Sequence, residues 1–175
     1  MKVVVVSYSL TGNNEALATS VAAQLAVKHI KVAEFKSRTM ATIFLDILFS
    51  RTPKVNPAVK EMEGNDLVIF AGPVWIGQVA KPLRAYLSYL KNISCEYAFI
   101  SISGGADGAN LKIAGELNKR AGREPAAVID LHIADLLPPE PKPNRKETSA
   151  YHLNDKDIKR LTNTIVTTLR QIKTS

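Results

Sequence analysis

The sequence predicts an α/β fold in which a five-stranded parallel sheet, doubly wound in the strand order 2-1-3-4-5, carries helices on both faces. Short apolar runs, of the kind found in strands that are buried on both faces, alternate with segments whose apolar residues recur at helical spacing. Parallel neighbours need crossover helices, which this alternation supplies. Because 175 residues fit one domain of this type, we expect a single domain over residues 1–175.

The first half of the chain contains three expected strands and two expected helices. Four consecutive valines near the N-terminus are typical of a buried strand. Leu17, Val21 and Leu25 then recur at the spacing of one helix face. A later helical stretch is ended by Pro53 and Pro57. We expect strands at residues 2–8, 32–35 and 67–71 and helices at residues 15–27 and 39–49.

The second half continues the alternation and closes with a helix. Val79, Leu83 and Leu87 again lie on one helix face. Asp155 and Asp157 fall in the first turn of the last helix, where the helix dipole favours negative charge. We expect helices at residues 79–90, 109–121 and 154–173, strands at residues 97–102 and 127–133, and an irregular Pro-rich segment at about 134–153.

Three loops contain the residues suited to bind a ligand. In an open α/β sheet, ligands bind at the carboxyl ends of the strands where the winding direction reverses, which is between strands one and three in this order. The unusual residues follow strands one, three and four. We therefore expect the site at this edge of the sheet.

The first loop, SLTGNN, directly precedes a helix. Backbone N–H groups at a helix start lack intrahelical partners and can bind an anion. The loop has no lysine, which suits a bound phosphate monoester better than a phosphoryl group in transfer. A helix start without any ligand is the alternative. The candidate residues are Ser9, Leu10, Thr11, Gly12, Asn13 and Asn14.

The second and third loops offer a stacking surface and a pliable backbone. The only tryptophan of the chain lies in the second loop, and aromatic stacking contributes roughly 0.5–1.5 kcal/mol beyond area burial. A tryptophan packed beneath the loop is the alternative. The third loop is glycine-rich, so its N–H groups can approach ligand carbonyls. The candidates are Pro73, Val74, Trp75, Ile76 and Gly77, followed by Ser103, Gly104, Gly105, Asp107 and Gly108.

Together the three loops resemble those of the flavodoxin-like, FMN-binding family. The first resembles its Ser/Thr-x-Thr-Gly-Asn-Thr motif, with Asn14 in the last place. Gly-Pro-Val-Trp-x-Gly is similar to the segment that lines the flavin ring, and Ser-Gly-Gly resembles the third flavin loop. The stretch 39–49 is similar to a subgroup whose role is often unassigned. The resemblance implies FMN, with the phosphate on residues 9–14 and the isoalloxazine between residues 73–77 and 103–108.

Three departures from the family pattern bear on function. Asn14 replaces a hydroxyl residue, so one phosphate bond is lost or taken over by the amide. The third loop has no aromatic residue, so one ring face is open unless Tyr151 or a partner subunit covers it. Carrier flavodoxins are typically acidic, whereas this chain has a net charge of +7, and positive charge favours a reduced, anionic flavin. The departures favour a reductase that admits a substrate.

Other classes of protein find little support. The single Cys95 excludes an internal disulfide, and the three histidines are not spaced for a metal site. Asp130 and His132 share one strand face as a structural pair, and Lys81 and Arg84 are expected to be solvated or to meet an anionic reductant. Basic residues without interleaved aromatics do not indicate nucleic-acid binding. We expect no membrane span, no signal peptide and a cytoplasmic protein.

The expected function is that of an FMN oxidoreductase that passes electrons from NAD(P)H to a small acceptor such as a quinone, without a catalytic side chain. One alternative is a flavodoxin-type electron carrier that docks on a redox partner protein. A second is a non-redox, anion-binding module. The Pro-rich stretch 137–141 is interpreted as a rigid linker or as a subunit arm of a homodimer.

Overall fold

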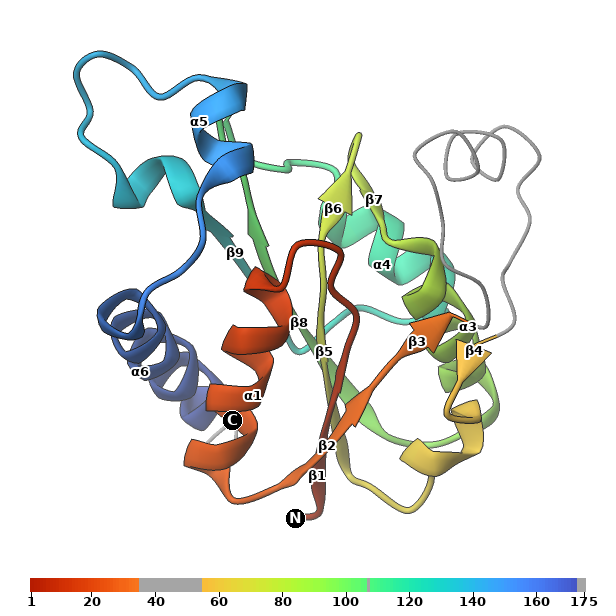
Figure 1. The fold of residues 1–175 in the computed structure, drawn as a ribbon. Helices are drawn as coiled ribbons and strands as arrows, with labels where there is room; N and C mark the ends of the chain where they lie inside the picture. The colour runs from red at the N-terminus through yellow and green to blue at the C-terminus, as the bar shows by residue number, and fades with distance from the viewer. Residues whose placement is uncertain (35–54, 107, 173–175) are drawn as a thin grey trace.

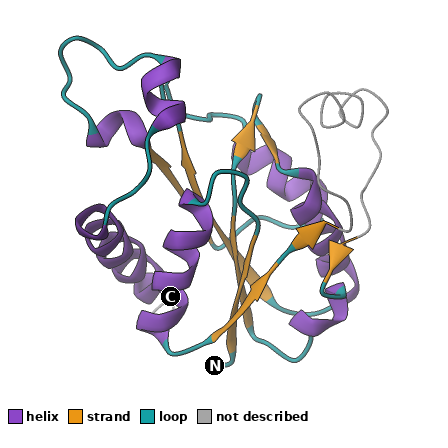
Figure 2. Ribbon diagram, viewed as in Figure 1, coloured by secondary structure: helices purple, strands orange, loops and turns teal. Residues whose placement is uncertain are grey.

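The computed structural model describes residues 1–34, 55–106 and 108–172. Its five-stranded parallel sheet has the order β2-β1-β5-β8-β9, which confirms the predicted order 2-1-3-4-5. Figure 1 shows α1 and α6 on one face of the sheet and α3 and α4 on the other, and Figure 2 shows the alternation of strands and helices. The sheet consists of β1 Val3–Ser7, β2 Lys28–Lys31, β5 Leu67–Ala71, β8 Glu96–Ser103 and β9 Ala127–His132. The helices are α1 Asn13–Leu25, α3 Lys81–Tyr89, α4 Ile113–Ala121, α5 Arg145–Ala150 and α6 Asp155–Ile172.

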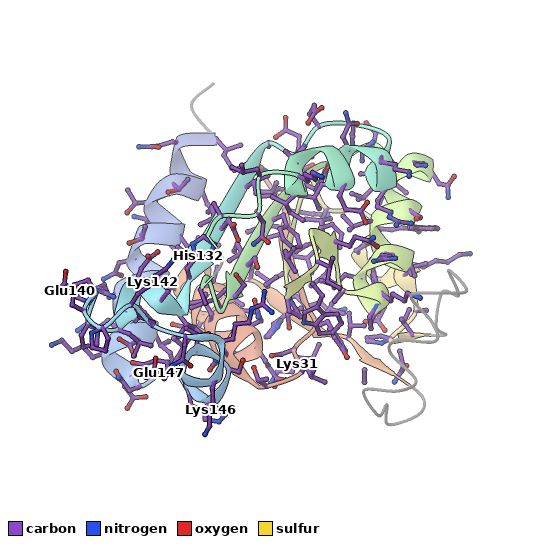
Figure 3. The ribbon with its side chains drawn as sticks, turned by 90° about the horizontal axis from the view of Figure 1, so that it is seen from above. Lys31, His132, Glu140, Lys142, Lys146 and Glu147 are labelled. Atoms are coloured by element: carbon purple, nitrogen blue, oxygen red, sulfur yellow. The ribbon has the colours of Figure 1, made fainter. Side chains whose placement is uncertain are left out.

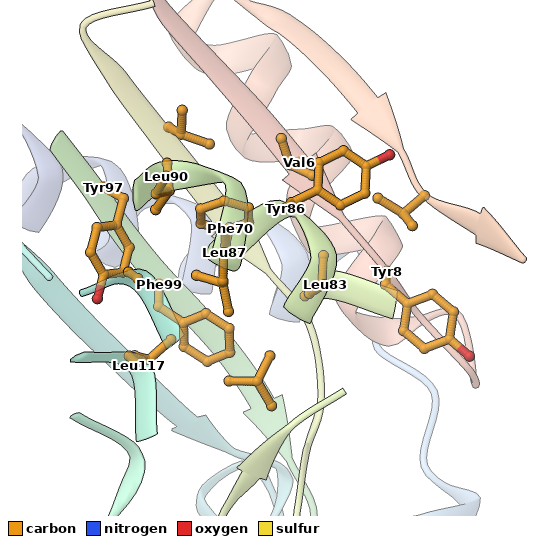
Figure 4. Packing of buried hydrophobic residues seen from close by; sticks show 14 of the residues in the cluster. Val6, Tyr8, Phe70, Leu83, Tyr86, Leu87, Leu90, Tyr97, Phe99 and Leu117 are labelled. Atoms are coloured by element: carbon orange, nitrogen blue, oxygen red, sulfur yellow. The ribbon is translucent and has the colours of Figure 1, made fainter. Parts of the chain in front are cut away.

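Two apolar clusters hold the helices against the two faces of the sheet. Successive strand residues point to opposite faces. Val4 and Val6 of β1 therefore pack with residues of α3 and α4, whereas Val5 packs with residues of α1 and α6. Figure 4 shows the first cluster, where Phe70 of β5 and Phe99 of β8 lie among side chains of α3. Full burial of one such side chain stabilises the fold by roughly 1.5–3 kcal/mol, so the sheet is a firm platform for the loops at its carboxyl edge.

The predicted second strand, at residues 32–35, is wrong. The strand that pairs with β1 is β2, and it comes earlier, at Lys28–Lys31. Ala33–Glu34 (β3) instead pairs antiparallel with Val55–Asn56 (β4). β2 lies at the edge of the sheet, and only its Ile30 is fully buried. The sequence KHIK of β2 is mostly polar, so it has no continuous apolar run of the kind by which the buried strands were predicted.

Two predicted helical regions also need correction. The helix expected at residues 109–121 begins only at Ile113, and Leu111, which falls within the expected range, is 93 % exposed. The segment 134–153, expected to be irregular, contains α5 and a 3-10 turn at Ile133–Leu136. The predicted helix at residues 39–49 and Phe35 lie outside the described residues.

The described part of the chain has neither a membrane-spanning helix nor a cluster of metal-binding side chains. None of the helices there combines the length and the apolar character that crossing a membrane would require. The same residues contain no group of three or more His, Cys, Asp or Glu side chains placed to hold a metal ion.

Candidate functional site

A pocket of about 230 Å³ opens where β1, β5 and β8 end. It is lined from all three predicted loops. The predicted residues that line it are Leu10, Thr11, Asn13, Asn14, Pro73, Val74, Trp75, Ser103 and Gly104. Beside them in the same loops, but not lining the pocket, are Ser9, Gly12, Ile76, Gly77, Gly105 and Gly108. Asp107 lies outside the described residues.

The start of α1 forms the end of the pocket suited to an anion. Gly12 is the N-cap and has a φ of 93°, a left-handed conformation that glycine adopts without steric cost. The Gly12 N–H donates to Ser9 Oγ at 3.0 Å, which closes the loop. No side chain caps α1. Its first N–H groups therefore keep no intrahelical acceptor, and the helix dipole makes this end partially positive.

Asn14 uses its side chain inside the protein. Its Nδ2 donates to the Ile102 carbonyl at 3.0 Å, and its Oδ1 accepts from the Ile102 N–H at 3.0 Å. The side chain is 4 % exposed, and both of its polar ends have partners. The amide therefore joins α1 to β8, and of the two alternatives for Asn14 these contacts favour the loss of one phosphate bond.

Asn13 makes a similar pair of bonds to a different segment. Its Nδ2 donates to the Tyr151 carbonyl at 2.8 Å, and its Oδ1 accepts from the Leu153 N–H at 3.0 Å. The side chain is buried. With both asparagine amides engaged in this way, the donors left for an anion are the backbone N–H groups of α1 and the hydroxyls of Ser9 and Thr11.

Trp75 lies on a short hairpin that rises above β5. Val74–Trp75 (β6) pairs antiparallel with Gln78–Val79 (β7), and Ile76 and Gly77 form the turn. The indole is half-buried and lines the pocket. It also packs edge-on against the Tyr8 ring, with the centroids 6.4 Å apart and the planes at 88°. This contact fixes the orientation of the indole while part of its surface remains available to a ligand.

The third loop rests on the end of β9. A Cβ atom at Gly105 would lie 2.4 Å from Cβ of His132, so only glycine fits there. His132 Nε2 lies 3.1 Å from Asp130 Oδ2, which confirms that these two residues are paired. The Asp130 carboxylate also accepts from the backbone N–H and the side chain of Asn110. The carboxylate therefore ties the far end of the loop to β9.

Four pocket residues were not predicted from the sequence. They are Ile102 at the end of β8, Ile133 after β9, and Thr148 and Ser149 of α5. The signal for α5 was readable in the sequence, because Asn144 and Glu147 have the spacing of a capping box, and the structure contains both of its reciprocal bonds. Pro-rich surroundings concealed this signal.

No ionisable side chain in the described part of the chain lines the pocket. The hydroxyl of Tyr151, one of the two candidates to cover the ligand, donates to Asp157 Oδ2 at 2.7 Å, and this bond raises the pKa of the tyrosine.

Three other reactive or charged side chains lie away from the pocket lining. Burial raises the pKa of Cys95, which precedes β8 at the opposite edge of the sheet. Lys81 is buried, so its interpretation as solvated is wrong. Arg84 bonds to Val79 O and Gln78.

The other titratable groups near this edge lie outside the pocket. His29 Nε2 lies 2.7 Å from Ser7 Oγ, and burial, with Lys31 nearby, lowers the pKa of the imidazole. Lys31 itself pairs with Glu15 at 2.7 Å. Figure 3, which looks down on this edge, shows a group of charged side chains around α5, namely Glu140, Lys142, Lys146 and Glu147. The pocket is thus neutral inside, with charged residues around it.

Comparisons with known proteins agree with this architecture. No protein-family model matches the chain, and no curated protein sequence does. Among solved structures, a flavoprotein of Lactobacillus acidophilus crystallised in complex with FMN has a TM-score of 0.63 at 21 % identity, over 74 % of this chain and 92 % of the other. A protein of Bacteroides uniformis has a TM-score of 0.65 at 15 % identity, over 75 % of this chain and 90 % of the other.

An archaeal flavodoxin matches nearly the whole of both chains. Its TM-score is 0.51 at 14 % identity, over 99 % of each chain. Similarity at such low identity concerns the arrangement of the backbone and not the ligand. The strand order, the two helical layers and these neighbours together show that this chain has the flavodoxin-like fold.

Proposed function

We propose that this protein is a flavoprotein that binds FMN in the pocket at the carboxyl edge of the sheet. The observation that carries the proposal is the convergence of the loops after β1, β5 and β8 on one pocket. The structural neighbour from Lactobacillus acidophilus, which was crystallised with FMN, supports the same choice of ligand.

The residues of the pocket fit the two ends of FMN. The N–H groups at the start of α1, with the hydroxyl of Thr11 in the pocket and that of Ser9 beside it in the same loop, form a neutral donor set for the phosphate monoester. Gly12 has room around it, since a Cβ there would meet nothing within 4 Å. Trp75 offers an aromatic surface to the isoalloxazine. The third loop brings Ser103 and Gly104 to the same space.

We further propose that the protein is an oxidoreductase that accepts electrons from NAD(P)H and passes them to a small acceptor such as a quinone. FMN, when bound, supplies the redox chemistry. The described residues that line the pocket include no acid or base, so their side chains have to bind and orient the ligand. Trp75 is the only aromatic residue that lines the described pocket, which supports a ring that is open to a substrate on one side.

The test is a visible spectrum followed by anaerobic reduction. The purified protein is titrated with FMN, and we expect saturable binding with a changed flavin spectrum. Addition of NADH or NADPH should then bleach the bound flavin rapidly, and a quinone should restore the colour. Bleaching only when a partner reductase is present would support an electron carrier instead. A protein that takes up no FMN would refute the proposal.

A further inference from the structure

The segment after β9 forms an ordered wall of the pocket. We call residues 137–153 the strap, and it contains α5. Asn144 Oδ1 accepts from the N–H groups of Lys146 at 2.9 Å and Glu147 at 3.1 Å, and Glu147 Oε2 accepts from the Asn144 N–H at 2.9 Å. Thr148 is 2 % exposed. These contacts stabilise a helix of six residues, which would be too short to persist alone.

The strap is attached to two of the pocket loops. At its end, Asn13 of α1 bonds to the Tyr151 carbonyl and the Leu153 N–H, at 2.8 and 3.0 Å. Just before its start, the Ala134 N–H donates to the Gly104 carbonyl at 3.0 Å. The position of α5 is therefore coupled to the anion-binding end and to the third loop.

The packing between α5 and the third loop leaves no spare space. A Cβ atom at Gly104 would lie 2.9 Å from Thr148 Oγ1 and 3.4 Å from Thr148 Cβ. A side chain at Gly104 would therefore displace Thr148 of α5. In Figure 1, α5 and the β6–β7 hairpin both lie above the loop that joins β1 to α1.

The hydroxyl groups that α5 presents to the pocket act as acceptors. Ser149 Oγ donates to the Arg145 carbonyl at 2.6 Å, and Thr148 Oγ1 donates to the Asn144 carbonyl at 3.2 Å. A hydroxyl has one proton and two lone pairs. Because each proton is used within the helix, each oxygen can accept a hydrogen bond. Ser149, which is exposed and lines the pocket, is the better placed of the two.

We propose that α5 is a second ligand-binding element of the pocket and that Ser149 accepts a hydrogen bond from an O–H or N–H group of the bound molecule. The inference rests on the proposed function, in which that molecule is FMN, with hydroxyls on its ribityl chain and an N–H on its ring. The strap thereby adds Thr148 and Ser149 to the pocket wall beside Ser103 and Gly104 of the third loop.

The test is FMN titration, followed by flavin fluorescence, of the wild type and of variants at one position. Ser149→Ala removes the acceptor and should raise the Kd about five- to tenfold. Ser149→Trp fills the space beside the ligand and should raise the Kd at least about a hundredfold. The matched controls are Ser88→Ala and Ser88→Trp, at an exposed position on α3, and both should bind as the wild type does. Melting temperatures confirm that each variant folds.

A second pair of variants tests the coupling through α5. Gly104→Ala should weaken FMN binding, because the new methyl displaces Thr148, and Gly104→Ala/Thr148→Ala should recover most of the loss. Wild-type affinity in Ser149→Ala and in a folded Ser149→Trp would overturn the inference and leave the proposed function intact. If Ser149→Trp does not fold, Ser149→Ala decides alone. A wild type that does not bind FMN would overturn both proposals.

Discussion

Asn14→Ala should destabilise the fold strongly, because the Asn14 amide makes the two hydrogen bonds to Ile102 that a longer β5 would otherwise make. The Gly72 N–H donates to the Ile100 carbonyl, so the peptide groups of Ile100, and of Ile102 two residues later, point toward β5. β5 ends at Ala71. The Asn14 side chain takes the position of the next peptide and satisfies both the N–H and the carbonyl of Ile102.

The expected loss follows from those two bonds. A buried polar group left without a partner costs about 1–3 kcal/mol, and the substitution orphans two of them. Because water can reach part of this region from the adjoining pocket, we expect a loss of about 2–4 kcal/mol in the free energy of unfolding. Asn163→Ala on α6 removes one exposed hydrogen bond, from Gln24 Nε2 at 3.2 Å, so it is the matched control and should stay within about 1 kcal/mol of the wild type.

Urea unfolding followed by circular dichroism measures both variants. The slope m should be the same in the wild type and the variants, so that a shifted midpoint reports stability and not a change in compactness. A loss of less than about 1 kcal/mol in Asn14→Ala at unchanged m would refute the reasoning, because ordinary exposed hydrogen bonds contribute that much.

Three further substitutions test other parts of the molecule. Ile76 has a φ of 52° and is 92 % exposed, at a turn whose next residue, Gly77, has a φ of 70°. Asn tolerates this conformation better, so Ile76→Asn should raise the Tm by about 2–4 °C in calorimetry, and a fall would contradict the strain. Trp75→Ala should raise the Kd for FMN about tenfold or more in a fluorescence titration, whereas an unchanged Kd would remove the indole from the site. Burial raises the pKa of Tyr86 to about 12, so the unfolded chain loses this proton near pH 10 while the folded chain keeps it. The resulting stability is complete below pH 10 and declines between pH 10 and 12 by up to about 1.4 kcal/mol per pH unit. Urea titrations from pH 8 to 12 should show a shallower decline in Tyr86→Phe, and equal slopes would contradict the assignment.

The sequence predicts best those elements that are buried on both sides. The strand LVIFA, residues 67–71, is found where it was expected, because a central strand of a parallel sheet must be apolar at every position. The sequence placed the second strand four residues too late, because the edge strand β2 buries only Ile30 and so has no continuous apolar run. α5 was missed because its stability comes from the Asn144–Glu147 capping box and from contacts with the pocket, which an apolar periodicity cannot reveal.

Some features of the candidate site were predictable from the sequence, whereas the hydrogen-bond partners of its side chains were not. The positions of Gly12 at the start of α1 and of Trp75 beside the pocket were predictable, because a glycine suits a tight turn and an exposed aromatic ring suits stacking on a ligand. The partners of Asn13 and Asn14 were not, since each amide bonds to backbone more than 80 residues away along the chain. A polar side chain does not specify in the sequence which distant peptide group it will meet. The same holds for Thr148, whose place against Gly104 depends on the tertiary fold.

Parallel calorimetric titrations with FMN and with riboflavin, which lacks only the phosphate, test the assignment of the α1 N-terminus most directly. We expect FMN to bind and riboflavin to bind at least about a hundredfold more weakly, because the N–H groups at the start of α1 would have no anion to hold. Equal affinity for the two flavins, or no binding of FMN, would contradict a phosphate site at this loop.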